Sequence, residues 1–337
     1  MTCNAMCTHT AITAPSGTTA DTCCPGGANH NTDVDCAAMC GNGVVEGPGE
    51  TCEPPGTATC DATCHRIGPT AFRVTTARIL SPHAVYNVPL AGCRDLTDMG
   101  VTVLGMNIDS LNTGLMTSIT NYSLNIVDVF RPLSQTAATS MDQIYVNAAC
   151  SAASCAPAAA MSMSVSPTAT NMATGTCFAP VAADVQPHCM GAGTCTGGYA
   201  AVNTISGPCF ANSESDITVT LSVAGTSVAV PLHHARIDAT YSGSPATSLT
   251  PGVIVGFLNA TDAADIVVTL PVIGARRLYN FLQAGGATQR ATDGSNQASS
   301  CNLNNGGAED DRDTVGGVTG FWFFLNVGLT QVTWTGP

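Results

Sequence analysis

Hydrophobic and polar positions alternate along most of the chain after residue 66, the pattern of β-strands that bury one face. β-Branched and aromatic residues, which favour strands, are concentrated in the same stretches. The alternation predicts strands over 72–80, 121–130, 217–223, 227–232, 235–241, 320–327 and 331–335. Short interruptions near 224–226 and 328–330 predict two hairpins, the second of them aromatic.

Helical periodicity is rarer. Leu111, Leu115 and Ile119 recur at four-residue spacing and predict a helix over 110–120, with shorter candidates over 252–258 and 276–282. Because antiparallel strands dominate, we expect an all-β domain, an antiparallel two-sheet sandwich similar to a jelly roll. The terminal aromatic hairpin is expected to fill its centre.

The segment 134–215 has a different texture, rich in alanine, serine, threonine and methionine, with few strand signals and six cysteines. A long stretch without regular structure is unusual inside a compact domain. We therefore expect a disulfide-pinned insertion that covers one side of the sandwich. Many connectivities are open; we favour the pairs Cys150–Cys155, Cys189–Cys195, Cys177–Cys209 and Cys93–Cys301.

The first 66 residues differ from the rest in composition: they hold nine of the 17 cysteines, separated mainly by glycine, proline, asparagine and aspartate. So short a segment buries little apolar surface and needs covalent or metal staples. We predict a small irregular module over 1–66 and a β domain over 67–337, in an oxidising, extracytoplasmic space. The odd cysteine count of this module leaves one thiol free, paired between the two domains, or paired with a residue or chain not shown.

No signal peptide precedes Cys3, so we expect either that the numbering begins inside a longer precursor or that the sequence is a mature form or a fragment. Cys60-Asp-Ala-Thr-Cys64-His65 is one residue longer than the C-x-x-C-H motif that attaches haem. Disulfides are the favoured state of these cysteines over haem attachment.

The string CGNGVVEGPGETC at 40–52, followed by Cys60 and Cys64, resembles the cysteine-rich repeat of myxobacterial surface and secreted proteins. The segment 23–36 is similar to the one that often precedes that repeat. The resemblance covers about residues 1–66 and departs after Cys52, where Glu-Pro-Pro-Gly replaces an acidic run. It implies an extracellular or cell-surface location and no particular activity.

Three acidic or amide-rich stretches have the residue types that bind calcium, which takes about six to eight oxygen ligands. The best spaced is Asn29, Asn31, Asp33 and Asp35, with an oxygen ligand at every second position. A weaker set lies within the repeat: Asn42, Glu46, Glu50 and Glu53. The third, just before the aromatic strand, comprises Glu309, Asp310, Asp311 and Asp313. For each, the alternative interpretation is a solvated turn.

Charge excludes several functions. Ten arginines, no lysine and 23 acidic residues give a net charge of −13, which disfavours binding to nucleic acid or anionic lipid. No apolar run approaches the roughly 18–20 residues that span a membrane, so we expect no membrane insertion.

No hydrolase elbow, zinc motif, phosphate loop or dinucleotide fingerprint occurs in the chain. His233 and His234 are adjacent on a predicted strand junction, so their side chains point to opposite faces and do not share a metal. The leading hypothesis is a non-catalytic extracellular protein for adhesion, ligand binding or surface assembly as a multimer or filament. Its partners would be other copies or a surface glycan. The alternative is an extracellular hydrolase with a site beneath 134–215, using His188, His233 or the cluster at 310–313.

Overall fold

The computed structural model describes residues 24, 27–47, 49–57, 60–88, 92–158, 163–180, 200–223, 226–270, 273–282, 288–290, 296–298 and 312–336. The chain divides into two compact units, Met1–Pro69 and Thr70–Pro337, close to the predicted boundary after residue 66. Among the described residues, no helix has the length and apolar character needed to cross a membrane.

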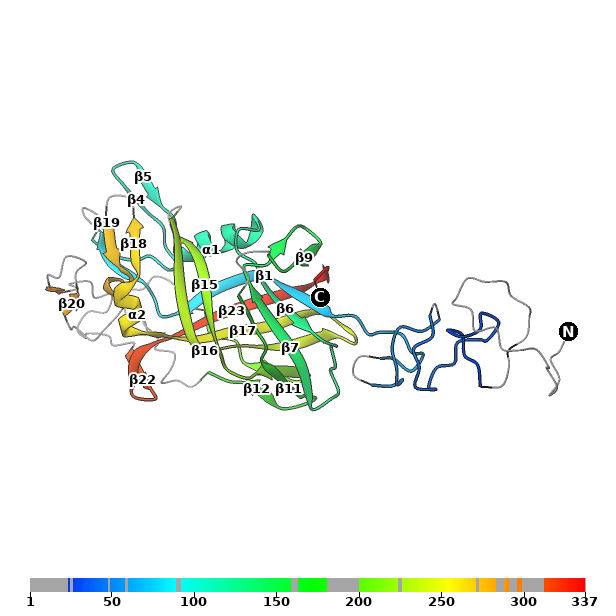
Figure 1. The fold of residues 1–337 in the computed structure, drawn as a ribbon. Coiled ribbons are helices and arrows are strands. Elements are labelled where there is room, and N and C mark those ends of the chain that lie inside the picture. The colour runs from blue at the N-terminus through cyan, green and yellow to red at the C-terminus, as the bar shows by residue number, and fades with distance from the viewer. Residues whose placement is uncertain are drawn as a thin grey trace. The chain divides into compact units, whose positions relative to one another are not determined.

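The larger unit is built around one sheet, as the strands in Figure 1 show. In spatial order its main strands are β1 (Thr70–Ser81), β6 (Ile126–Phe130), β7 (Thr139–Val146), β11 (Thr168–Met172), β14 (Cys209–Asn212), β16 (Thr226–Gly243), β17 (Ala246–Asn259) and β23 (Val318–Trp334). All neighbours in this order are antiparallel, and β1 also pairs with β23. The sheet therefore closes on itself.

Shorter strands extend or cover this closed sheet. Those paired with it are β15 (Ser215–Val223), β10 (Met163–Val165), β22 (Arg312–Val315), β8 (Ala149–Cys150) and β9 (Ser154–Ala156). Two-stranded ribbons are β2 (Val85–Val88) with β3 (Gly92–Asp95), β4 (Val101–Val103) with β5 (Met106–Ile108), β12 (Thr176–Phe178) with β13 (Ile205–Ser206), β18 (Val267–Leu270) with β19 (Gly274–Arg277), and β20 (Thr288–Arg290) with β21 (Asn296–Ala298). The helices are α1 (Leu111–Thr120), α2 (Ala260–Asp265) and the 3₁₀ turn η1 (Leu278–Asn280).

The main core fills the interior of the closed sheet. Phe130 lies edge-on to Phe72 and Phe210, with ring centroids 6.0 and 5.1 Å apart, and all three side chains are fully buried. A second apolar cluster packs on the other face of β17 and β23, where Phe178 of β12 lies against Phe324. The all-β prediction is confirmed. The predicted two-sheet sandwich is not clearly present, because the strands pair in one closed cycle.

Three local predictions differ from the structure: the helices over 252–258 and 276–282 and the turn near Gly328. Of the second helix only the 3₁₀ turn η1 forms, directly after β19. Residues 252–258 belong to β17 and every one is buried. The alternation that identifies a strand is therefore absent, and a continuous apolar run does not distinguish a buried strand from a buried helix. The predicted turn near Gly328 does not exist, and β23 runs straight through it. Gly328 lies opposite Thr76, and a Cβ there would be 2.7 Å from the Thr76 hydroxyl oxygen. This glycine therefore permits close strand approach.

Segment 134–215 is not an insertion over the sheet, because β7, β11 and β14 lie within it and belong to the closed cycle. Its small side chains weakened the hydrophobic pattern; Ala169 of β11, for example, is fully buried inside the sheet. The predicted disulfides Cys150–Cys155 and Cys177–Cys209 are confirmed. The predicted pairs Cys189–Cys195 and Cys93–Cys301 rest on side chains outside the described set.

The smaller unit is held by disulfides, as predicted. Its described bonds join Cys24 to Cys36, Cys40 to Cys64 and Cys52 to Cys60. Cys52, Cys60 and Cys64 are buried against one another and form its small core. These bonds replace the apolar packing that so short a segment lacks.

Candidate functional site

A projecting hairpin, β4–β5, stands out from the larger unit in Figure 1. Its two strands pair from Val101–Ile108 to Val103–Met106, and the Thr102 hydroxyl donates to Asn107 Oδ1 across them at 2.6 Å. Leu104 and Gly105 form the two-residue turn with φ of 51° and 79°. Two successive positive φ values match the hairpin turn that suits the twist of paired strands.

The tip of this hairpin is apolar. Leu104 is 74% exposed and Met106 beside it is 46% exposed, and Met99, just before the base of the hairpin, is 47% exposed. Asparagine and glycine are the residues favoured at positive φ, and a leucine there costs about 1 kcal/mol. The chain therefore keeps an exposed aliphatic side chain at a position where both solvation and backbone geometry favour asparagine.

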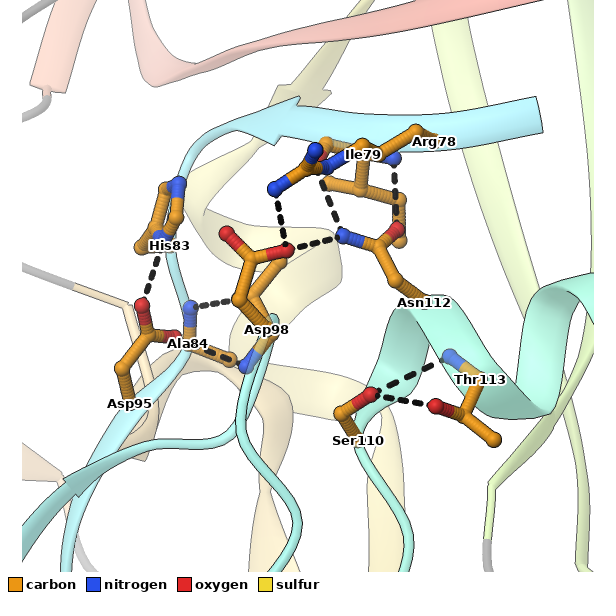
Figure 2. A network of polar contacts seen from close by, with 10 residues as sticks. Arg78, Ile79, His83, Ala84, Asp95, Asp98, Ser110, Asn112 and Thr113 are labelled. Atoms are coloured by element: carbon orange, nitrogen blue, oxygen red, sulfur yellow. Dashed lines mark hydrogen bonds and ion pairs between the residues drawn. The ribbon is translucent and has the colours of Figure 1, made fainter. Parts of the chain in front are cut away.

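The base of the hairpin is fixed to β1 through Asn112 of α1 (Figure 2). Asn112 Oδ1 accepts the Ile79 N–H at 2.7 Å, and its Nδ2 donates to the Ile79 carbonyl at 3.0 Å. The same Nδ2 donates to Asp98 Oδ1 at 2.8 Å, and Asp98 also pairs with Arg78 at 3.1 Å. Because β6 pairs with β1 only from Thr70 to Arg73, Asn112 replaces a strand along the uncovered edge.

A second set of contacts holds the segment before the hairpin. His83 Nδ1 lies 2.7 Å from Asp95 Oδ2, and both side chains are almost fully buried. Asp95 Oδ1 accepts the Thr97 N–H at 2.8 Å, and the Thr97 hydroxyl accepts the Ala84 N–H at 2.7 Å. These bonds satisfy polar groups that would otherwise be costly to bury.

The segment after the hairpin is bound to the segment before it. The Leu111 N–H donates to the Leu96 carbonyl and the Asn112 N–H to the Thr97 carbonyl, at 2.8 and 3.0 Å. Ser110 caps α1 by accepting the Thr113 N–H at 3.1 Å. Both ends of 99–109 are therefore fixed, and the hairpin is presented on a rigid base. We call residues Arg78, Ile79, His83, Asp95, Thr97, Asp98 and Asn112 the hairpin clamp.

The clamp contains three side chains whose ligand atoms lie within 4.8 Å of one another, His83, Asp95 and Asp98. Asp95 is already bound by His83 and Thr97, and Asp98 by Arg78 and Asn112. Both carboxylates already accept hydrogen bonds or ion pairs from neighbouring side chains and backbone, which is typical of a network that stabilises the fold. In the smaller unit, Glu50 and Glu53 lie near Cys40 and Cys64, but that cysteine pair is a disulfide and offers no thiolate.

Two cavities lie inside the larger unit next to the clamp. The first, about 50 Å³, is lined by aliphatic and aromatic side chains including Ile79, Leu96, Ile108 and Phe281. The second is about 30 Å³ and shares Ile79 with the first. Both are far below the roughly 300 Å³ of a small-molecule site, so neither holds a substrate in this conformation.

The predicted calcium ladder in the smaller unit makes turn contacts. Asn29 Oδ1 accepts the Thr32 N–H at 3.1 Å, and Asp33 Oδ1 accepts the Asp35 N–H at 3.0 Å. Asn31 turns its amide nitrogen to the Val45 carbonyl at 2.7 Å. These contacts do not test calcium binding, which stays a prediction for this stretch.

The repeat motif is organised around Glu46, whose side chain is fully buried. Its carboxylate accepts the His30 N–H at 2.9 Å, the Met39 N–H at 2.7 Å and the Asn42 amide at 3.1 Å. The Met39 N–H is the main cause that holds the Glu46 pKa below its usual value, against the effect of desolvation. Glu46 thus connects three loops by accepting hydrogen bonds from N–H groups. A cation site would instead surround the ion with oxygen acceptors.

The third predicted metal cluster is described only at Asp313. Its two oxygens accept the Thr314 N–H at 2.7 Å and the Trp322 indole N–H at 3.1 Å. Glu309, Asp310 and Asp311 lie outside the described residues. Calcium binding at this loop therefore also stays a prediction.

The two adjacent histidines contact different acids. His233 lies between Asp216 at 3.2 Å and Asp262 at 3.1 Å, bonded through opposite ring nitrogens, while His234 bonds Glu214 at 2.8 Å. Burial lowers the His233 pKa, but its hydrogen bonds to Asp262 and Asp216 outweigh this and the net pKa is raised. The two rings therefore contact different acids at ion-pair distances, and the prediction that they do not share a metal stays a prediction.

Sequence reasoning missed the hairpin. The signal was present as Leu104-Gly105 between the short runs 101–103 and 106–108, but the turn lacks the usual asparagine. Comparison of the chain with protein-family models, with curated proteins and with solved structures gave no match in any of the three.

Proposed function

We propose that this chain is a non-catalytic extracellular surface protein that assembles with other copies through the tip of the β4–β5 hairpin. The observation that carries the proposal is Leu104, an exposed leucine in left-handed backbone at the end of a clamped hairpin. An outlier that the surrounding structure maintains at a cost points to a functional role. The disulfides favour an extracellular setting.

A second copy is the partner that fits best. The tip residues are aliphatic, whereas sugar rings are bound by stacked aromatic side chains and hydrogen-bonding groups. The smaller unit has exposed apolar side chains of its own, at Val34, Met39, Val44 and Val45, which a neighbouring copy would offer. A contact between two different surfaces is head-to-tail and generates rings or filaments.

Leu104→Asn tests the proposal, because asparagine suits the turn and removes the apolar tip. We expect the free energy of unfolding of the variant to be about 1 kcal/mol higher than that of the wild type. The self-association constant, measured by sedimentation velocity, should fall at least tenfold. Since each copy has a charge of −13, association of the wild type should strengthen with added salt.

Met141→Gln is the matched control, because Met141 on β7 is 71% exposed and lies away from the hairpin in sequence and fold. It should leave association unchanged. A wild-type chain that stays monomeric at all concentrations, or an equal loss in both variants, would contradict hairpin-mediated assembly.

The hydrolase alternative has less support. His188, Asp310 and Asp311 lie outside the described residues, and both ring nitrogens of His233 are occupied by carboxylates. The described cavities are apolar and small, whereas a hydrolytic site needs converging polar groups in a cleft.

A further inference from the structure

Two aspartates lie side by side inside the closed sheet. Asp128 of β6 is the cross-strand partner of Phe72 and Ile144, and Asp142 of β7 is the partner of Phe130. Direct partners on antiparallel strands share a face, so both carboxylates point into the aromatic interior. Their register makes them diagonal neighbours, and their exposed fractions are 0% and 4%.

Asn212 of β14 reaches the same place from two strands away. Its cross-strand partner on β11 is Ala169, whose own partner on β7 is Ser140, two residues before Asp142. Ala169 is a small side chain on the intervening strand and leaves room above it. The Asn212 amide, also 4% exposed, lies close enough to Asp142 to influence its titration.

None of the six side-chain polar atoms of Asp128, Asp142 and Asn212 makes a well-formed hydrogen bond among the described residues, although Asp128, Asn212 and the Gln143 N–H lie close enough to Asp142 to affect its titration. Buried polar groups in folded proteins are almost always paired, because an unpaired group costs about 1–3 kcal/mol and a charge costs more. No basic side chain of the described chain forms an ion pair with either aspartate. The interior therefore holds two carboxyl groups with no basic partner and an amide oxygen with no well-formed hydrogen bond.

Burial raises the pKa of Asp142 to about 6, even though Asp128 and Asn212 beside it act to lower it. Burial and the Asp142 charge raise the Asp128 pKa well above its usual value. Two outcomes resolve such a pair: the carboxyls share a proton, or a cation neutralises both. The Asn212 carbonyl oxygen favours the cation, because a proton shared between the two carboxyl groups still leaves this oxygen without a donor.

We propose that Asp128, Asp142 and Asn212 form a structural calcium site inside the closed sheet. Two carboxylates neutralise the +2 charge, and together with the amide carbonyl they offer up to about five oxygens of the six to eight that calcium takes. The irregular, all-oxygen ligand set suits calcium better than magnesium, which requires near-octahedral geometry. The site joins β6, β7 and β14 across β11, so the ion would hold the closed sheet together as it folds.

Both tryptophans, Trp322 and Trp334, lie in β23, so their fluorescence reports unfolding of the larger unit alone. The test is urea unfolding of full-length protein, refolded beforehand in calcium or in EDTA, at a pH above 7. With free calcium at about 100 times its dissociation constant, the apparent unfolding constant should fall about 100-fold. Asp33→Asn, in the smaller unit, should leave this shift unchanged.

Asp142→Asn should abolish the calcium effect. Because that variant alters a buried cluster, Asn212→Asp provides a second measurement. It adds a ligand charge, so it should destabilise the protein in EDTA and recover stability in calcium.

The proposal is overturned if the wild-type transition is the same in calcium and EDTA, or if Asp142→Asn keeps the full shift. It is also overturned if Asn212→Asp is equally unstable in both. A shared proton would instead give a calcium-independent loss of stability as pH rises through about 6, because the folded pKa of Asp142 lies above its unfolded value.

Discussion

Asn112→Ala tests whether the hairpin clamp stabilises the larger unit. The substitution removes both hydrogen bonds to the Ile79 backbone and the one to Asp98. Ile79 is 3% exposed, and each buried backbone group left unpaired costs about 1–3 kcal/mol. With part of this recovered by relaxation, we expect the free energy of unfolding to fall by about 2–4 kcal/mol.

Calorimetry and tryptophan fluorescence both measure this loss. For a unit of this size, about 3 kcal/mol lowers the melting temperature by about 6–12 °C. The matched control is Asn107→Ala, which removes an exposed amide that bonds only Thr102 across the hairpin; it should change stability by less than about 0.5 kcal/mol. Amide exchange at Ile79 should rise in Asn112→Ala alone. A loss below about 1 kcal/mol would show that water satisfies the β1 edge, and the clamp would then have no energetic role.

Two further predictions concern the smaller unit and the disulfides. Because hydrogen bonds from backbone N–H groups hold the pKa values of Glu46 and Asp61 below their usual values, the smaller unit should be stable above about pH 4.5 and unfold as pH falls through the lowered pKa values. The amide NMR signals of His30 and Met39 measure this in the full chain, and Glu46→Gln should remove the part of the pH dependence that Glu46 contributes and keep the part from Asp61; loss of structure on raising the pH would contradict the reasoning. The double alanine variant of Cys177–Cys209, 32 residues apart, should cost about 3–4 kcal/mol, and that of Cys150–Cys155, 5 apart, about 2 kcal/mol. Equal losses in urea unfolding would reject the chain-entropy reasoning.

Several features followed from local pattern. The strand at 72–80, the helix at 110–120 and the β15–β16 hairpin were predictable, because alternation, four-residue spacing and turn residues act over neighbouring positions. The disulfide Cys150–Cys155 followed from its short separation, and Cys177–Cys209 was one of the pairings favoured within the same segment. The separate smaller unit followed from cysteine density.

Other features depended on contacts between distant residues. Whether the strands formed two sheets or one closed sheet was decided by the pairing of β1 with β23, whose partners are about 250 residues apart in the chain. The contact of Asn112 with the edge of β1 could not be predicted from the sequence either. An asparagine that faces solvent on a helix and one that hydrogen-bonds a strand edge can have the same neighbours in the sequence.

The candidate polar sites also differed in whether the sequence or the tertiary structure revealed them. Sequence alone determined the class of protein, all-β and disulfide-stabilised, with acidic stretches and no catalytic motif, because composition and short-range pattern carry that information. Only the tertiary structure brought Asp128, Asp142 and Asn212 to one point inside the sheet and placed Leu104 at the end of a clamped hairpin. Strand register and closure decide which side chains meet, and both arise from long-range packing that no local pattern encodes.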